Sequence, residues 1–138
     1  MRKLFFLPAF LCMSSLMLAA CTGSGNLSQW PEGSEPQTVG LLVAGRFVAS
    51  PHNSFRPPAP PKSIAYPETC AWYGAMKFAE VTGNEGLMKQ MQDRFEPLYA
   101  EEAYLRPKAN HVDNAVFGAV PLELYMYSGD KRYFDLGI

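Results

Sequence analysis

Two similar segments decide the fold: FAEVTGN at residues 78–84 and LYMYSGD at residues 124–130, which are offset by 46 positions. In both, an apolar run with helical spacing ends in a hydroxyl residue, a glycine, and then Asn or Asp. Glycine is favoured just after a helix, and Asn and Asp are favoured just before one. Each segment therefore predicts a helix, a tight turn and a second helix.

The first pair of helices is predicted on either side of Gly83. Pro67–Thr82 has apolar residues at three- and four-residue spacings, its proline suits the first turn of a helix, and Glu68 suits the positive end of the helix dipole. A second helix is predicted from about Gly86 to Tyr99, with Pro97 kinking or ending it. Its apolar stripe, which we expect in the core, consists of Leu87, Met88, Met91, Phe95 and Leu98.

The second pair follows at the same offset. After a loop over residues 105–110, a third helix is predicted from Asp113 to about Ser128, kinked at Pro121, and a fourth begins at Lys131. Helix pairs cannot bury their apolar faces alone, so such units occur in arrays. The offset falls within the HEAT-like range of about 40–47 residues, and it also suits the helical-hairpin toroids of sugar-processing enzymes.

The predicted fold class is therefore all-α. Because two hairpins do not complete an array, we expect the chain, which stops early in its fourth helix, to be the front part of a longer protein.

The N-terminus has the pattern of an export signal. Arg2 and Lys3 precede a short, mostly apolar run over residues 4–18, and small residues lead to Cys21. The run is too short to span a bilayer comfortably. The segment LAAC at residues 18–21 resembles the lipobox of bacterial lipoproteins, which implies that Cys21 becomes the first mature residue and carries acyl chains. The alternative is an ordinary secretory signal with a chance cysteine.

This signal places the protein in the cell envelope, held to a membrane by its lipid anchor. The expected location is the outer membrane or the periplasm. Thr22 is not an acidic residue of the kind that retains lipoproteins at the inner membrane, which favours the outer membrane. Once Arg2 and Lys3 are removed, acidic residues outnumber basic ones, so nothing suggests a nucleic-acid partner. Cys70 is then the remaining thiol, and we expect it in the core.

The segment between signal and helices is predicted to lack a packed core. Residues 22–35 are rich in Gly, Ser and Asn and read as a tether, and FRPPAPP at residues 55–61 must be extended. Residues 39–50 are predicted as a short strand or an extended arm. The predicted organisation is a lipoprotein signal over residues 1–20, a flexible tether and proline-rich arm over 21–62, and the helical domain over 63–138.

No complete catalytic set is visible from residue types alone. A glycine-rich phosphate loop and a metal-spaced cluster are missing from the sequence, so we expect no cofactor and no metal. His52 and His111 are each more often structural than catalytic when they stand alone. The best local constellation is HVDN at residues 111–114, where Asp113 is either a helix N-cap or a catalytic carboxylate at a helix start.

A family resemblance bears on this choice. The segments PETCAWYGA (67–75), RFEPL (94–98) and HVDNAVFGAVPLELY (111–125) resemble the front of bacterial glycoside hydrolases of families 88 and 105, the unsaturated glucuronyl and unsaturated rhamnogalacturonyl hydrolases. The resemblance covers residues 66–137, about half of the chain. It implies an (α/α)6 toroid of six helical hairpins, of which this chain holds the leading ones.

The resemblance also implies a substrate and a reaction. Family members hydrate the C4–C5 double bond of the unsaturated uronic acid that polysaccharide lyases leave on oligosaccharides. Asp113 matches one of two important aspartates. The main proton donor lies in a later Trp-x-Asp motif, which follows neither Trp30 nor Trp72 here. Asn114 and Ala115 depart from the family pattern, which leaves the substrate open.

Two residues beside Asp113 complete the predicted site. We expect His111 and Trp72 to bind substrate, since sugar rings stack on aromatic side chains, although Trp72 is equally suited to core packing. The sequence thus supports a hydrolase that acts on unsaturated uronic-acid oligosaccharides. The alternative is a non-catalytic helical-repeat surface lipoprotein that binds glycans or proteins.

Overall fold

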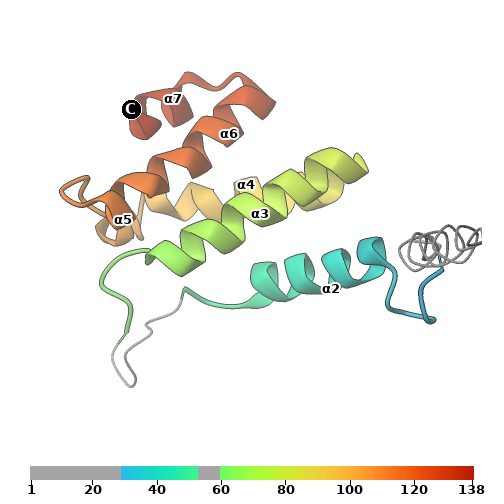
Figure 1. The fold of residues 1–138 in the computed structure, drawn as a ribbon. Helices are drawn as coiled ribbons and strands as arrows, with labels where there is room; N and C mark the ends of the chain where they lie inside the picture. Colours follow the sequence, from blue (N-terminus) through green and yellow to red (C-terminus); the bar gives the residue numbers. More distant parts are fainter. Residues whose placement is uncertain (1–28, 53–59) are drawn as a thin grey trace, which may run out of the picture. The chain divides into compact units, whose positions relative to one another are not determined.

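A computed structural model describes residues 29–52 and 60–138 (Figure 1). Residues 33–138 form one compact unit, and residues 29–32 belong to a separate N-terminal unit. The elements of the described residues are all helical, which confirms the all-α fold class. The predicted signal, Cys21 and the greater part of the proline-rich arm lie outside the described residues.

The helices of the compact unit pack around α3. Helix α2 and helices α4 and α6 each contact it, and α7 packs against α6. Figure 1 shows α2 on one side of α3 and α6 with α7 on the other. The elements in chain order are α2 (Pro36–Ala49), α3 (Tyr66–Thr82), α4 (Glu85–Phe95), η2 (Glu96–Tyr99), η3 (Ala103–Leu105), α5 (Val112–Ala115), η4 (Val116–Gly118), α6 (Ala119–Ser128) and α7 (Lys131–Gly137).

The two predicted turns are confirmed. Gly83 after α3 has φ 63° and Gly129 after α6 has φ 73°, the left-handed conformation that glycine adopts without steric cost. Asn84 and Asp130 then cap α4 and α7, each accepting a 2.9 Å hydrogen bond from a backbone N–H of the first turn. The unit of helix, turn and helix therefore repeats at the offset that the sequence predicted.

The first helix of the compact unit was not predicted. Residues 39–50 were expected to form a strand or an extended arm, and this is wrong, because Pro36–Ala49 is helical and the compact unit begins near residue 33 rather than 63. Its small residues explain the difference. Gly40 lies so close to Phe78 of α3 that an added Cβ would be 2.2 Å from the ring, and Ala44 is buried one turn later. Tertiary packing at this spacing overrides the strand preference of the valines.

The predicted third helix is divided into α5, η4 and α6. Pro121, in the first turn of α6, has no N–H to donate to the carbonyl of Phe117, and its ring would clash with that carbonyl in a continuous α-helix. The preceding turn, Val116–Gly118, is accordingly a 3₁₀ turn. Pro97 acts similarly in the second predicted helix, which continues as the 3₁₀ turn η2.

The core is aromatic and centres on Phe95. This ring has no exposed surface and lies 5.5 Å from Trp72, 5.8 Å from Phe117 and 5.6 Å from Tyr133, measured between ring centroids. The predicted stripe of α4 and η2 is buried throughout. Cys70, in contrast, is exposed, so its predicted core position is wrong. Two positions before buried Trp72, it points to the other side of α3.

A glycine contact between η4 and α7 should be sensitive to substitution. A Cβ added to Gly118 would lie 2.6 Å from the carbonyl oxygen of Gly137. We expect Gly118→Ala to lower the free energy of unfolding by about 1–3 kcal/mol through overpacking. Gly74→Ala, in open space on α3, is the matched control and should raise it by about 0.5–1 kcal/mol. Urea unfolding of the full chain measures both, and equal midpoints would contradict the packing of α7 on η4.

Candidate functional site

Asp113 and His111 lie together on the surface at the start of α5. His111 caps this helix, because its Nδ1 accepts a 3.2 Å hydrogen bond from the backbone N–H of Asp113. The interpretation of Asp113 as the N-cap is therefore wrong. The Asp113 side chain is 62% exposed, and its Oδ2 lies 3.6 Å from His111 Nδ1. The structure thus brings together two of the three residues predicted to contact substrate.

The start of α3 lies at the same end of the compact unit (Figure 1). The pKa of the Tyr66 hydroxyl is raised, chiefly by its hydrogen bond to Cys70 and by the charge of that thiol, and to a smaller extent by burial and the charge of Asp113. Tyr66 is half exposed, and Cys70 is exposed. A ligand on this surface would meet a carboxylate, an imidazole, a phenol and a thiol.

Trp72 is not part of this surface. Its ring has no exposed area, and its Nε1 donates a 3.3 Å hydrogen bond to the carbonyl of Met91 on α4. The ring lies between Phe47 of α2, at 5.8 Å, and Phe95 of α4, at 5.5 Å. In this structure Trp72 offers no face for a sugar to stack on, and its geometry is that of a core residue with a satisfied indole N–H.

Asp113 and His111 have the chemistry of a proton-transfer pair. An exposed carboxylate within 3.6 Å of an imidazole nitrogen can orient or exchange a proton with a ligand or water. The surface around them is open: pockets of about 570, 350 and 260 Å³ occur in the described part of the chain, and none of the three is lined by either residue. His111 and Asp113 can therefore bind a polar group of a ligand, but these two residues do not enclose it.

A second group of charged residues, which the sequence did not predict, lies where α2, α3 and α4 meet, and all but the 34% exposed Glu102 are largely buried. Arg94 of α4 donates from Nη2 to Glu68 Oε1 of α3 at 2.8 Å. The same carboxylate oxygen lies 2.5 Å from Nδ1 of His52, just after α2. The other ring nitrogen of His52 lies 3.3 Å from Glu102 Oε2. We call these four residues, His52, Glu68, Arg94 and Glu102, the Arg94 cluster.

The guanidinium of Arg94 also holds the end of α2. Its Nη1 donates to the carbonyls of Ser50, at 2.6 Å, and Val48, at 3.4 Å. Its carbon Cζ lies 4.5 Å from the ring centroid of Phe47 and 5.3 Å from that of Trp72, so two aromatic rings contact the cation. The side chains of Arg94 and Glu68 are 10% and 5% exposed. Nη1 and Nη2 are matched in this way, whereas Nε is buried without a hydrogen-bond partner among the described residues. The Nη contacts and the two rings are therefore what offset the burial of this charge pair.

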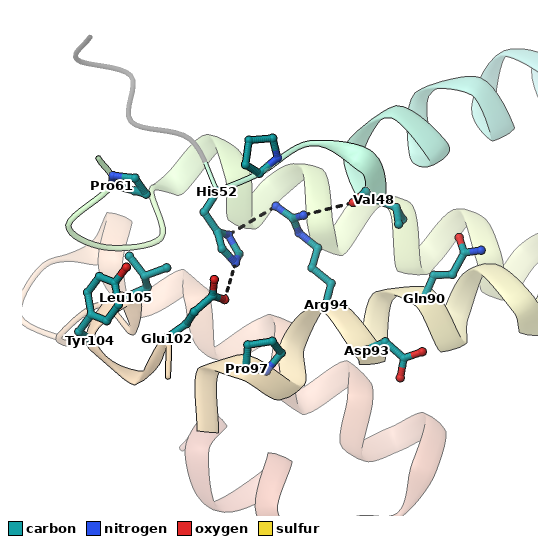
Figure 2. A pocket seen from close by; sticks show the side chains of 11 residues that line it. Val48, His52, Pro61, Gln90, Asp93, Arg94, Pro97, Glu102, Tyr104 and Leu105 are labelled. Carbon is teal, nitrogen blue, oxygen red and sulfur yellow. Dashed lines mark hydrogen bonds and ion pairs between the residues drawn. The ribbon is translucent and has the colours of Figure 1, made fainter. Parts of the chain in front are cut away.

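The largest of the three pockets lies beside this cluster and has a volume of about 570 Å³. Figure 2 shows His52, Arg94 and Glu102 on one wall, with Tyr104 and Leu105 nearby. The polar groups of the wall are already bonded to one another, since His52 joins Glu68 to Glu102. The geometry is therefore that of a structural link between helices with a hollow beside it.

One signal in the sequence pointed to the Arg94 cluster. Glu68 lies on the same helical face as Trp72, Ala75 and Ala79, which are all buried, so a charge at this position requires a partner. From the sequence, Glu68 was predicted instead to interact with the positive end of the helix dipole. Its partners lie 16 and 26 residues away on different elements, and no local spacing connects them.

Within residues 29–52 and 60–138, no group of three or more His, Cys, Asp or Glu side chains is arranged to hold a metal ion. In that part of the chain, no helix has the length and apolar character needed to cross a membrane.

Replacing members of the Arg94 cluster should show strong coupling. We expect Arg94→Met to lower the free energy of unfolding by about 3–5 kcal/mol, because it leaves the buried Glu68 carboxylate without its cation. In the double variant with Glu68→Gln the loss should be smaller than the sum of the single losses by at least about 1 kcal/mol. Lys89→Met, which removes an exposed pair with Asp93, is the control and should cost under about 1 kcal/mol. Additive losses in urea unfolding would contradict the pairing.

Comparison of the chain with protein-family models, with curated proteins and with solved structures gives no match.

Proposed function

We propose that residues 33–138 form the leading helical hairpins of a glycoside hydrolase that removes unsaturated uronic acid from lyase-generated oligosaccharides, with Asp113 as one of its catalytic carboxylates. The observation that carries the proposal is the placement of Asp113. It is 62% exposed, it is not the helix cap, and it stands beside an imidazole at the end where α3 and α5 begin. A carboxylate free of a capping role is available for chemistry.

The packing of the two hairpins supports an array. Helices α3 and α6, which are equivalent in the repeat, contact each other, and Lys77 of α3 donates to Glu123 of α6 at 3.0 Å. These two residues are separated by the repeat offset of 46 positions, so the units stack in register. If further hairpins stack in the same way, the starts of α3, α6 and their equivalents face one end of a ring. A site at that end would contain Asp113.

The proposed reaction assigns separate roles to the groups. A protonated aspartic acid adds its proton to C4 of the unsaturated sugar, and water adds at C5. The resulting hemiketal opens and releases the next sugar. Asp113 is the partner carboxylate that orients the water or the donor, and His111, whose Nδ1 lies 3.6 Å from the Asp113 carboxylate, binds substrate. The proposed proton donor is the aspartate of a Trp-x-Asp segment, which residues 1–138 do not contain.

A non-catalytic surface lipoprotein that binds glycans or proteins is the second candidate. The observation that favours it is the open surface around Asp113, because none of the three pockets described includes this residue. In both candidates the chain is exported and held in the cell envelope through acylation of Cys21. The two functions differ in whether the double bond of the substrate is consumed.

The substitution Asp113→Asn distinguishes the two functions. In the product of the complete gene, we expect it to lower turnover by about 10²–10⁴-fold, the usual contribution of a group that assists proton transfer. Stability should change by less than about 0.5 kcal/mol, because the side chain is exposed and His111 remains the cap. The assay follows the ultraviolet absorbance of the C4–C5 double bond in an unsaturated uronyl disaccharide.

A matched control for this substitution is Asp135→Asn on α7. Its side chain is 58% exposed and paired with Lys131 on the same helix, so turnover should stay at the level of the unmodified enzyme. Full turnover by the Asp113 variant would leave this residue without a catalytic role. A complete gene product that never consumes the double bond, with Asp113 intact, would favour the binding function.

A further inference from the structure

Helix α2 is apolar on both of its faces. Its inner face packs against α3 and α4, with Ala44 buried and Phe47 and Val48 in contact with the core. Its outer face carries a second apolar row, in which Leu42 is 68% exposed and Val43 is 65% exposed. A helix that is apolar all round is normally buried on all sides. The outer face of α2 is therefore a candidate interaction surface.

The exposed residues form a continuous row. Val39, Leu42 and Val43 stand at positions i, i+3 and i+4, the spacing that aligns side chains along one face of a helix. Leu41 is also exposed, but the helical period places it on the other side of α2, so it is not part of this row. Single exposed apolar residues are common on protein surfaces, but a contiguous row indicates a partner. We call Val39, Leu42 and Val43 the α2 row.

The charge of α2 indicates what kind of partner fits. The helix has no acidic side chain, and its single charged residue, Arg46, continues the α2 row one turn beyond Leu42 and Val43. Arg46 is exposed. An apolar row that ends in an arginine suits a phospholipid surface, where the apolar side chains enter the boundary of the acyl chains and the guanidinium reaches the phosphates.

The position of α2 in the chain supports the same partner. Fourteen residues, 22–35, separate Cys21 from Pro36, the first residue of α2. A segment of that length cannot span more than about 50 Å even when it is fully extended. If Cys21 is acylated, α2 is thus held within reach of the bilayer at high local concentration, and a weak lipid contact is sufficient to dock it.

We propose that the α2 row lies on the surface of the membrane that holds the lipid anchor. The proposal rests on the proposed acylation of Cys21 for its tether. Because α6 and α7 lie on the other side of α3 from α2 (Figure 1), this contact turns them away from the lipid. The contact also fixes the orientation of the domain, which a flexible tether alone does not do.

The test measures the depth of a nitroxide label on α2. The label is attached through Leu42→Cys in a chain where exposed Cys70 is replaced by serine, and the acylated protein is reconstituted in vesicles of phosphatidylethanolamine with phosphatidylglycerol. A matched control carries the label through Val112→Cys on α5, because Val112 is 69% exposed, close to the 68% of Leu42. We expect the label on α2 to be several-fold less accessible to a water-soluble nickel chelate than the control label.

Equal accessibility of the two labels would overturn the proposal. Spectral broadening of the α2 label that disappears on dilution with unlabelled chain would also overturn it, because a second copy would then cover the row. The anchor is tested separately: detergent partitioning of the unmodified chain against Cys21→Ala decides whether Cys21 is acylated. The depth measurement uses only chain that this partitioning shows to be acylated. Equal accessibility of the labels then counts against the α2 contact, whereas equal partitioning of the unmodified chain and Cys21→Ala counts against the anchor.

Discussion

The buried guanidinium of Arg94 is the constraint on which the arrangement of the first three helices depends. A cation that is 10% exposed is tolerated only where most of its donors are matched. The groups that contact Arg94 come from α3, through Glu68 and the ring of Trp72, and from the end of α2, through the carbonyl of Ser50 and the ring of Phe47. Its Nε has no hydrogen-bond partner among the described residues. The end of α2, the start of α3 and the end of α4 must therefore meet at one point.

This constraint also determines how α3 is oriented. When Glu68 faces Arg94, the helical period places Trp72 in the core beside Phe95, and it leaves Tyr66 and Cys70 on the outside. On this outer side of the α3 start, the charge of Asp113 contributes to the raised pKa of the Tyr66 hydroxyl. The surface proposed for catalysis and the Arg94 cluster thus lie on opposite faces of the start of α3. The contacts of the Arg94 cluster therefore determine which side of α3 this surface occupies.

Local features of the fold could be predicted from the sequence, and non-local ones could not. The turns at Gly83 and Gly129 and the stripe of α4 follow from residue types within a few positions. Helix α2 was mistaken for an extended segment because its conformation depends on Gly40 meeting Phe78, 38 positions away. In the candidate site, His111 and Asp113 are neighbours in the sequence, so their proximity is local, but the capping of α5 by His111 was not predicted. The burial of Trp72 depends on packing from two other helices.

Amide hydrogen exchange within α2, compared between the unmodified chain and Arg94→Met, tests the central role of Arg94 most directly. If the guanidinium is what holds α2 to α3 and α4, residues 40–48 should lose protection in the variant, while α6 and α7, which do not contact Arg94, keep theirs. Unchanged protection of residues 40–48, or an equal loss in all helices, would contradict the account.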